Sequence, residues 1–218
     1  FQTNSDVEVI LYLYDIYGHE CIKYLKGMFA FALWDNLKNE LFIGRDRFGM
    51  KPLYFYKDRN RFIFSSTLRS IKKNTKIDTI INENCLLEYF LYGYIPSPNT
   101  IWKKIFSLPE AHYAVVKKGN ILIKNYWRIK IGSKKLSKDK IIEEINEKIN
   151  LSIKQHLRSD VPVGLFYSGG MDSFLIKEKF KKLSKKKIVE FVAEYKKKNN
   201  KLKLKKNITA KIVFERLS

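Results

Sequence analysis

The chain has few cysteines and histidines, which build disulfide frameworks and many metal centres, and its apolar residues form no long run. Its 218 residues include only two cysteines and three histidines. Two unpaired cysteines fit a reducing compartment, and the histidines at positions 19, 112 and 156 lack metal-ligand spacing. No apolar run approaches the roughly 20 residues of a membrane span, and no signal-like N-terminus is visible, although a missing first segment would hide one. We therefore expect a cytoplasmic protein without a membrane anchor.

Two common nucleotide-binding patterns are also missing. No Gly-Lys-Ser/Thr completes a Walker A loop, and the absence of G-x-G-x-x-G disfavours a dinucleotide fold. With 43 Lys and Arg against 22 Asp and Glu, the net charge is +21. Residues 177–206 alone hold 14 lysines and 3 glutamates, a net charge of +11. These lysines come without the arginines and aromatic platforms of a nucleic-acid reader, so we expect solvated helix faces and no specific nucleic-acid partner.

An apolar run followed by two glycines is the most informative feature present. Residues 161–167 are too few for a helix and are rich in β-branched and aromatic side chains, which favours a strand buried on both faces of a parallel sheet. The run ends in Ser168-Gly169-Gly170-Met171-Asp172-Ser173. A helix is expected to follow, opened by Ser173. The pattern predicts a strand, a loop and a helix start.

The residue types of this loop suit a polyphosphate. Gly169 and Gly170 can bring bare backbone N–H groups close to an anion, while Ser168 and Ser173 add hydroxyl donors. The positive end of the following helix dipole favours negative charge at the same place. A structural alternative stays open, because a glycine pair often turns a strand into a helix and serine is a good N-cap in its own right.

Asp172 does not fit a site built only to hold anions. The simplest explanation is that a divalent cation, Mg²⁺, bridges its carboxylate to the phosphates. The loop therefore predicts ATP with magnesium as the ligand, with Asp172 as the metal and pyrophosphate ligand.

The loop and several upstream segments resemble the glutamine-dependent asparagine synthetases. The loop is similar to the pyrophosphate loop of ATP pyrophosphatases that adenylate a carboxylate, and the preceding residues 159–164 narrow the likeness to this family. The resemblance covers residues 1 to about 183, and extends more weakly beyond. The upstream segments, which keep the family's order and spacing, are residues 5–10, 27–32, 44–54 and 93–96.

This resemblance implies a fold and a domain organisation. Residues 1–132 would be a partial class II glutamine amidotransferase domain of α+β class, with the layered αββα arrangement of N-terminal-nucleophile (Ntn) glutaminases. Residues 133–137 would be a linker. Residues 138–218 would begin an α/β adenine-nucleotide α-hydrolase-like domain, the ATP pyrophosphatase part of the synthetase. The chain would thus be a fragment that lacks its first segment and most of the synthetase domain.

The family's glutaminase nucleophile, a cysteine at the mature N-terminus, has no counterpart here. Cys21 and Cys85 are internal and lie among apolar neighbours, so we expect core thiols. Asp6 matches the family aspartate that pairs with the α-ammonium of glutamine. Its structural alternative is a helix start, in which Ser5 and Glu8 form a capping box and an acid in the first turn suits the dipole.

The rest of the first domain is expected to be scaffold. Arg45, Asp46 and Lys51 lie at a turn between strands, where an exposed ion pair and a role at the interdomain surface are the two interpretations. The pattern predicts helices at about 7–17 and 82–92, a second short helix ending at Gly27, antiparallel strands near 29–33, 41–43, 53–56 and 61–64, and a helix from about 141 to 157.

The resemblance also implies a reaction. Glutamine is hydrolysed in the first domain, ammonia passes to the second, and aspartate is activated by ATP to an aspartyl-adenylate that ammonia converts to asparagine. The chain would belong to a carbon-nitrogen ligase with glutamine, aspartate and ATP as partners, and a homodimer is left open. Three alternatives remain: a relative that amidates another acceptor, a noncatalytic remnant, and a basic module that binds polyanions.

Overall fold

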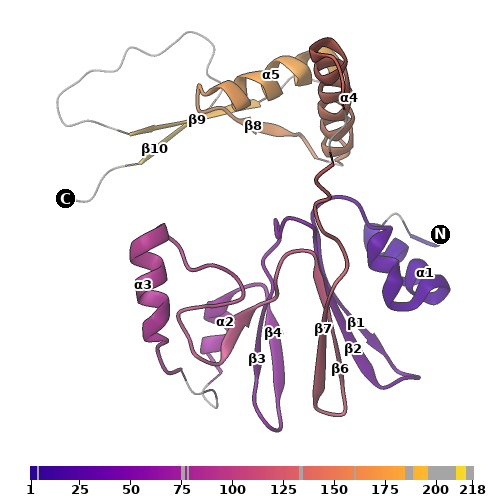
Figure 1. Cartoon of the computed structure of the whole chain (residues 1–218), viewed down its shortest axis with the longest axis vertical. Coiled ribbons are helices and arrows are strands. Elements are labelled where there is room, and N and C mark those ends of the chain that lie inside the picture. The colour runs from indigo at the N-terminus through magenta and orange to yellow at the C-terminus, as the bar shows by residue number, and fades with distance from the viewer. Residues whose placement is uncertain are drawn as a thin grey trace. The chain divides into compact units, whose positions relative to one another are not determined.

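The computed structural model divides into two compact units, Phe1–Ile131 and Gly132–Ser218 (Figure 1). It describes residues 1–3, 5–74, 77, 79–132, 135–159, 161–184, 189–195 and 210–214. Part of the expected linker, Asp160 and half of the lysine-rich residues 177–206 lie outside these residues. None of the described helices is long and apolar enough to cross a membrane. The fold is a mixed α/β arrangement in which each unit has its own sheet or sheets.

The first unit contains two antiparallel sheets. The four-stranded sheet has the order β1-β2-β6-β7, and the three-stranded sheet has the order β4-β3-β5. The strands are β1 (Ala30–Asp35), β2 (Glu40–Arg45), β3 (Tyr54–Lys57), β4 (Phe62–Ser65), β5 (Ile105–Ser107), β6 (His112–Lys117) and β7 (Asn120–Asn125). The helices are α1 (Asp6–Tyr17), the 3₁₀ helix η1 (Gly18–Lys23), α2 (Leu68–Lys72) and α3 (Glu83–Tyr92).

Alternation along β2 explains how the layers of this unit form. Neighbouring residues of a strand point to opposite faces, and β2 has apolar side chains on both. Phe42 belongs to a core cluster that includes Cys21 and Ile22 of η1. Ile43 belongs to a second cluster, shared with Phe55 of β3, that lies between the two sheets. A third cluster packs α2 against the outer face of the smaller sheet. The order is therefore helix, sheet, sheet, helix.

Most of the elements predicted for this unit are confirmed. Helix α1 ends at Gly18, β1 and β2 pair as an antiparallel hairpin, and β3 and β4 do the same. The second short helix is wrong in type and extent. It is a 3₁₀ helix that ends at Lys23 rather than near Gly27, and its Cys21 and Ile22 side chains are fully buried in the core.

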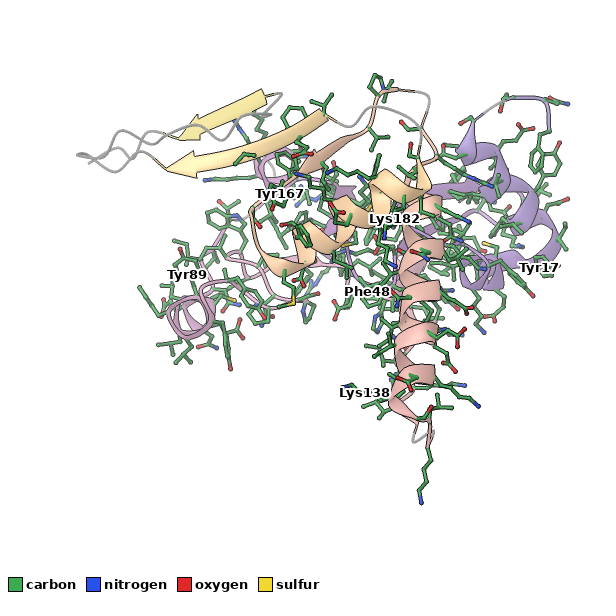
Figure 2. All side chains as sticks on the ribbon, turned by 90° about the horizontal axis from the view of Figure 1, so that it is seen from above. Tyr17, Phe48, Tyr89, Lys138, Tyr167 and Lys182 are labelled. Atoms are coloured by element: carbon green, nitrogen blue, oxygen red, sulfur yellow. The ribbon has the colours of Figure 1, made fainter. Side chains whose placement is uncertain are left out.

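Helix α3 presents apolar side chains to solvent. Asn82 is its N-cap and Gly93, with φ of 76°, ends it. Only Cys85 of this helix is buried. Figure 2 shows side chains projecting from most sides of the helix around Tyr89, and Phe90 is 81% exposed.

The described part of the second unit has a parallel sheet and two helices. Helix α4 (Lys138–His156) is followed by β8 (Gly164–Phe166), α5 (Met171–Leu183), β9 (Val189–Tyr195) and β10 (Ala210–Phe214). The strand order is β10-β9-β8, and both pairs are parallel. The expectation of a strand buried on both faces is wrong for β8. It is three residues long, it pairs only with β9 among the described strands, and Phe166 is 72% exposed.

Candidate functional site

The loop from Ser168 to Ser173 connects the end of β8 to the start of α5. The amide of Tyr167 still donates to the carbonyl of Phe191 at 2.8 Å, so the chain leaves the sheet after this residue. Gly169 then takes φ of +82°, a left-handed conformation that favours glycine. An added Cβ would meet nothing within 4 Å. Glycine is therefore required here by the backbone conformation, and the space beside the backbone is open.

Helix α5 begins earlier than the sequence predicts. Its N-cap is Gly170, which has no side chain to accept a hydrogen bond, and the helix starts at Met171. The prediction that Ser173 opens the helix is therefore wrong. Ser173 lies in the first turn, and its hydroxyl donates to the carbonyl of Gly170 at 2.9 Å. Because no side chain caps this end, the first-turn N–H groups stay available to an anion.

The two serine hydroxyls lie at the same place on the loop. Ser168 Oγ and Ser173 Oγ are 3.2 Å apart, within hydrogen-bond distance. Ser168 Oγ also accepts from the amide of Gly170 at 3.4 Å. The loop thus gathers two hydroxyls and a run of helix N-terminal amides, the donor set that a phosphate group requires.

Asp172 is the second residue of α5, and its side chain is exposed. The described residues contain no cluster of three or more His, Cys, Asp or Glu side chains that could hold a metal by themselves. A cation at Asp172 would therefore take its remaining ligands from phosphates and water, as Mg²⁺ commonly does. The all-oxygen donors of Asp172, Ser168 and Ser173 fit that ion.

Lys177 is a neighbour of the loop that the sequence did not single out. Its Nζ lies 2.7 Å from a carboxylate oxygen of Glu190, and both side chains are 18% exposed. The same ammonium lies 4.5 Å from the ring centroid of Tyr167, the residue just before the loop. Figure 2 labels Tyr167 beside α5. The Lys177–Glu190 ion pair fixes α5 against β9. In the sequence, only the position of Lys177, one turn after Ser173, indicates that this lysine lies near the loop.

Asp6 is the first residue of α1, and the helix is capped by the residue before it, Ser5. Ser5 Oγ accepts from the amide of Val7 at 3.3 Å. Glu8 accepts from the Thr3 hydroxyl and from the amides of Gln2 and Thr3, and these bonds hold the pKa of its carboxyl below the usual value. The Ser5 amide instead donates to Thr3 Oγ1 at 3.2 Å.

The predicted capping box is therefore wrong in its reciprocal half, because Glu8 reaches past Ser5 to the residues before it. Ser5 and Glu8 together order the start of the helix. The exposed side chain of Asp6 is left out of this arrangement and can face a ligand.

Both cysteines are buried and free. Burial raises the pKa of Cys21 to about 11 and raises that of Cys85 as well. A protonated, inaccessible thiol is a poor nucleophile. Neither residue is placed to act in glutamine hydrolysis.

The expected exposed ion pair at Arg45, Asp46 and Lys51 is wrong. Asp46 is 1% exposed and accepts backbone amides, while Arg45 donates to the carbonyls of Gly49, Lys51 and Leu108. The Arg45 and Asp46 side chains both bond to the backbone, because a charge removed from water needs several partners, and Lys51 contributes backbone atoms to both. Together they hold the turn after β2 in one conformation.

Comparison with known families assigns both parts of the chain. Residues 1–127 match the glutamine amidotransferase domain, and residues 144–216 match asparagine synthase. The chain belongs to the glutamine-dependent asparagine synthetase family. Asp6 lies within the first match and the Ser168–Ser173 loop within the second.

Individual relatives agree with this assignment. A candidate glutamine-hydrolysing asparagine synthetase of Methanocaldococcus jannaschii is 41% identical over 176 residues, which cover 79% of this chain and 34% of the relative. Asparagine synthetase (glutamine-hydrolyzing) 1 of Bacillus subtilis is 34% identical over 177 residues, covering 81% and 28%. A protein of Gibberella zeae named amidase chry2 is 29% identical over 178 residues, covering 79% and 26%. The chain thus spans about a third or less of the length of these relatives.

Proposed function

We propose that the chain is part of an enzyme that uses glutamine and ATP to convert aspartate to asparagine. The observation that carries this proposal is the loop from Ser168 to Ser173, which joins a parallel strand to a helix whose first turn has no side-chain cap. The loop lies in the segment that matches asparagine synthase. The two matched families account for an amide donor and for an ATP-dependent acceptor step in one protein.

In this proposal each loop residue has a defined task. Ser168 and Ser173 donate their hydroxyls to phosphate oxygens, and the amides around Gly169 and Gly170 donate alongside them. Once the two hydroxyls turn from their present bonds within the loop, these donors stabilise negative charge on departing pyrophosphate. Asp172 accepts the cation that accompanies the phosphates. When bound, Mg²⁺ would neutralise phosphate charge as a Lewis acid.

The resemblance implies how the bonds change. A side-chain carboxylate oxygen of aspartate attacks the α-phosphorus of ATP, the bond from that phosphorus to the bridging oxygen breaks, and pyrophosphate leaves. Ammonia from glutamine then attacks the acyl carbon and releases AMP. The net products are asparagine, glutamate, AMP and pyrophosphate.

The first unit is proposed to supply the ammonia. Asp6 would pair with the α-ammonium of glutamine, and the helix-sheet-sheet-helix order supports an Ntn-type αββα glutaminase domain over residues 1–132. Residues 133–137 would be a linker, and residues 138–218 would begin an ATP-pyrophosphatase domain. A cytoplasmic location and a homodimer belong to the same proposal.

A different acceptor is the second candidate. Gibberella zeae amidase chry2 is similar over 79% of the chain although its name is not that of an asparagine synthetase. Residues that choose the acceptor need not lie in the shared part. A noncatalytic module that binds polyanions through its lysines is the third candidate, and it predicts binding that ignores magnesium and collapses with salt.

Identification of the nucleotide products tests the proposal. The purified protein is incubated with Mg-ATP, aspartate and either glutamine or an ammonium salt, and the products are identified by ³¹P NMR. We expect AMP and pyrophosphate in equal amounts, formed only when aspartate is present. The ammonium salt bypasses the first unit, so it isolates the second. Formation of ADP and phosphate, or equal turnover without aspartate, would contradict the proposed reaction.

A further inference from the structure

Helix α1, which carries Asp6, is attached to its unit along a single edge. None of its twelve residues is buried. Ile10, Leu13 and Tyr14 touch the core cluster beneath it, while Val7 and Ile16 on the other sides are 59% and 68% exposed. Apolar contact therefore holds this helix along one edge only. Its polar contacts gain importance.

Tyr14 of α1 makes such a contact, and His19 of the adjoining η1 reaches the same carboxylate. The Tyr14 hydroxyl shares its one proton between two acceptors, Asp35 Oδ2 at 3.0 Å and Glu40 Oε1 at 3.3 Å. His19 Nε2 lies 2.9 Å from Glu40 Oε1. The Tyr14 ring also stacks on Phe42 at 5.7 Å. We call Tyr14, His19 and Glu40 the α1 tether.

The strand pairing shows why the tether matters to the sheet as well. Asp35 and Glu40 are direct partners across β1 and β2, where two like charges repel. Glu40 is only 4% exposed, so its charge must be compensated locally. The Tyr14 hydroxyl lies between the two carboxylates, and Lys38 and Lys117 approach them at 3.2 and 3.5 Å.

We propose that the α1 tether positions Asp6 for glutamine, an inference that rests on the proposed role of Asp6. Asp6 precedes Tyr14 by eight residues on one continuous helix, about 12 Å along its axis. A rigid helix held at Tyr14 and at the adjoining η1 transmits a fixed orientation to its first turn. Loss of the tether leaves the fold intact and lets the start of α1 move.

The tether is sensitive to acid. The titratable and charged groups that face Glu40 are Tyr14, His19, Asp35, Lys38 and Lys117. Burial opposes ionisation of Glu40, but the bonds from His19 and Lys117 outweigh it and lower its pKa. Protonation of Glu40 at acid pH removes the negative charge to which Tyr14 and His19 both bond and so weakens both bonds. The tether is therefore intact at neutral pH and is weakened as the pH falls below the ordinary range of a glutamate.

Hydrogen exchange of the intact chain tests the tether. Tyr14→Phe keeps the ring and removes the hydroxyl, and Tyr12→Phe is the matched control on the same helix. We expect the amides of α1 to exchange about tenfold faster in Tyr14→Phe at pH 7, because this variant loses one hydrogen bond to a charged group. The amides of β2 and β6 should keep their rates. Tyr12→Phe should exchange like the unchanged protein. Unchanged α1 exchange in Tyr14→Phe would overturn the tether.

Two further arms separate this inference from the proposed function. Between about pH 5 and 3, the range in which Glu40 takes up its proton, α1 protection corrected for intrinsic exchange should fall in the unchanged protein and stay flat in Glu40→Gln. Glutamine affinity should fall several-fold in Tyr14→Phe and be lost in Asp6→Asn. If Tyr14→Phe loosens α1 but keeps glutamine affinity while Asp6→Asn loses it, positioning is wrong and the proposed site stands. If Asp6→Asn binds glutamine as tightly as the unchanged protein does, or if the unchanged protein does not bind glutamine, then both the positioning inference and the proposed glutamine site fail.

Discussion

Asp46 is a buried carboxylate that holds four backbone amides at the end of β2. Oδ1 accepts from Phe48 and Met50, and Oδ2 accepts from Phe29 and Lys51. Both oxygens are thus fully engaged by donors within 3.3 Å. The carboxylate fixes the turn that the family motif of residues 44–54 encodes.

Asp46→Asn should destabilise the first unit by about 3 kcal/mol. Whichever way the amide is turned, its NH₂ group faces two backbone donors and leaves them unpaired in a buried place. Asp15→Asn, at an exposed position near the end of α1, is the control and should change stability by less than about 0.5 kcal/mol. The measurement is urea unfolding followed by tryptophan fluorescence. Equal midpoints for the two variants would show that the Asp46 network contributes nothing.

At the scale of residues, the sequence reveals chemistry better than it reveals burial. The glycines and serines of the loop were predicted from their types, and the structure gathers the serine hydroxyls 3.2 Å apart. Asp46 could not be placed in the same way. A motif of charged residues at a turn is typical of an exposed pair, and only the fold decides that one of them is covered.

At the scale of elements, periodic segments were predictable and short ones were not. Helices α1, α3 and α4 and the two hairpins carry clear periodicity. The short helix α2 and strand β5, five and three residues long, are too short to give such a signal. η1 became a 3₁₀ helix because Cys21 and Ile22 are drawn into the core as adjacent residues.

The starts of α4 and α5 show how the predicted first residue of a helix can be wrong by a few positions. Ser137 caps α4 by accepting from the amide of Lys140 at 3.5 Å. The same residue type at Ser173 predicts a cap for α5, but Gly170 takes that place. Serine is the better cap in general. The glycine start leaves the helix end open, which suits a ligand rather than a cap.

At the scale of the whole molecule, the first unit should lose stability in acid. Hydrogen bonds lower the pKa of Asp35 to about 2, chiefly the one from the Lys38 amide, and the pKa of Glu40 is lowered as well. The unfolded chain therefore binds protons before the folded one as the pH falls. We expect full stability above about pH 4.5 and a progressive loss down to about pH 2.

The same unit should lose stability in alkali. Burial raises the pKa of Tyr14 and Tyr126 to about 12 and that of Cys21 to about 11. The unfolded chain then releases protons first, so stability falls as the pH rises from about 9 towards 12. All three tryptophans, Trp34, Trp102 and Trp127, lie in this unit, so urea midpoints by fluorescence report on it alone. A midpoint independent of pH would contradict both limbs.

The two units differ in how much core and sheet structure each contains among the described residues. The first has three core clusters and two sheets, while the second begins a sheet in which β8 pairs only with β9 among the described strands. The loop of the second unit is nevertheless a local structure, formed by the end of β8, the start of α5 and the residues between them. The loop is therefore the part of the account open to the sharpest test.

Binding of Mg-ATP by Asp172→Asn tests the central claim most directly. Asp139→Asn is a matched control, because Asp139 is also the second residue of a helix, α4, and loses the same dipole interaction. Affinity is measured by calorimetry at about 0.15 M salt, where exposed lysines are screened. The account predicts that Asp172→Asn weakens ATP about tenfold or more and abolishes the magnesium dependence, while Asp139→Asn binds normally. Unaltered magnesium-dependent affinity in Asp172→Asn would contradict it.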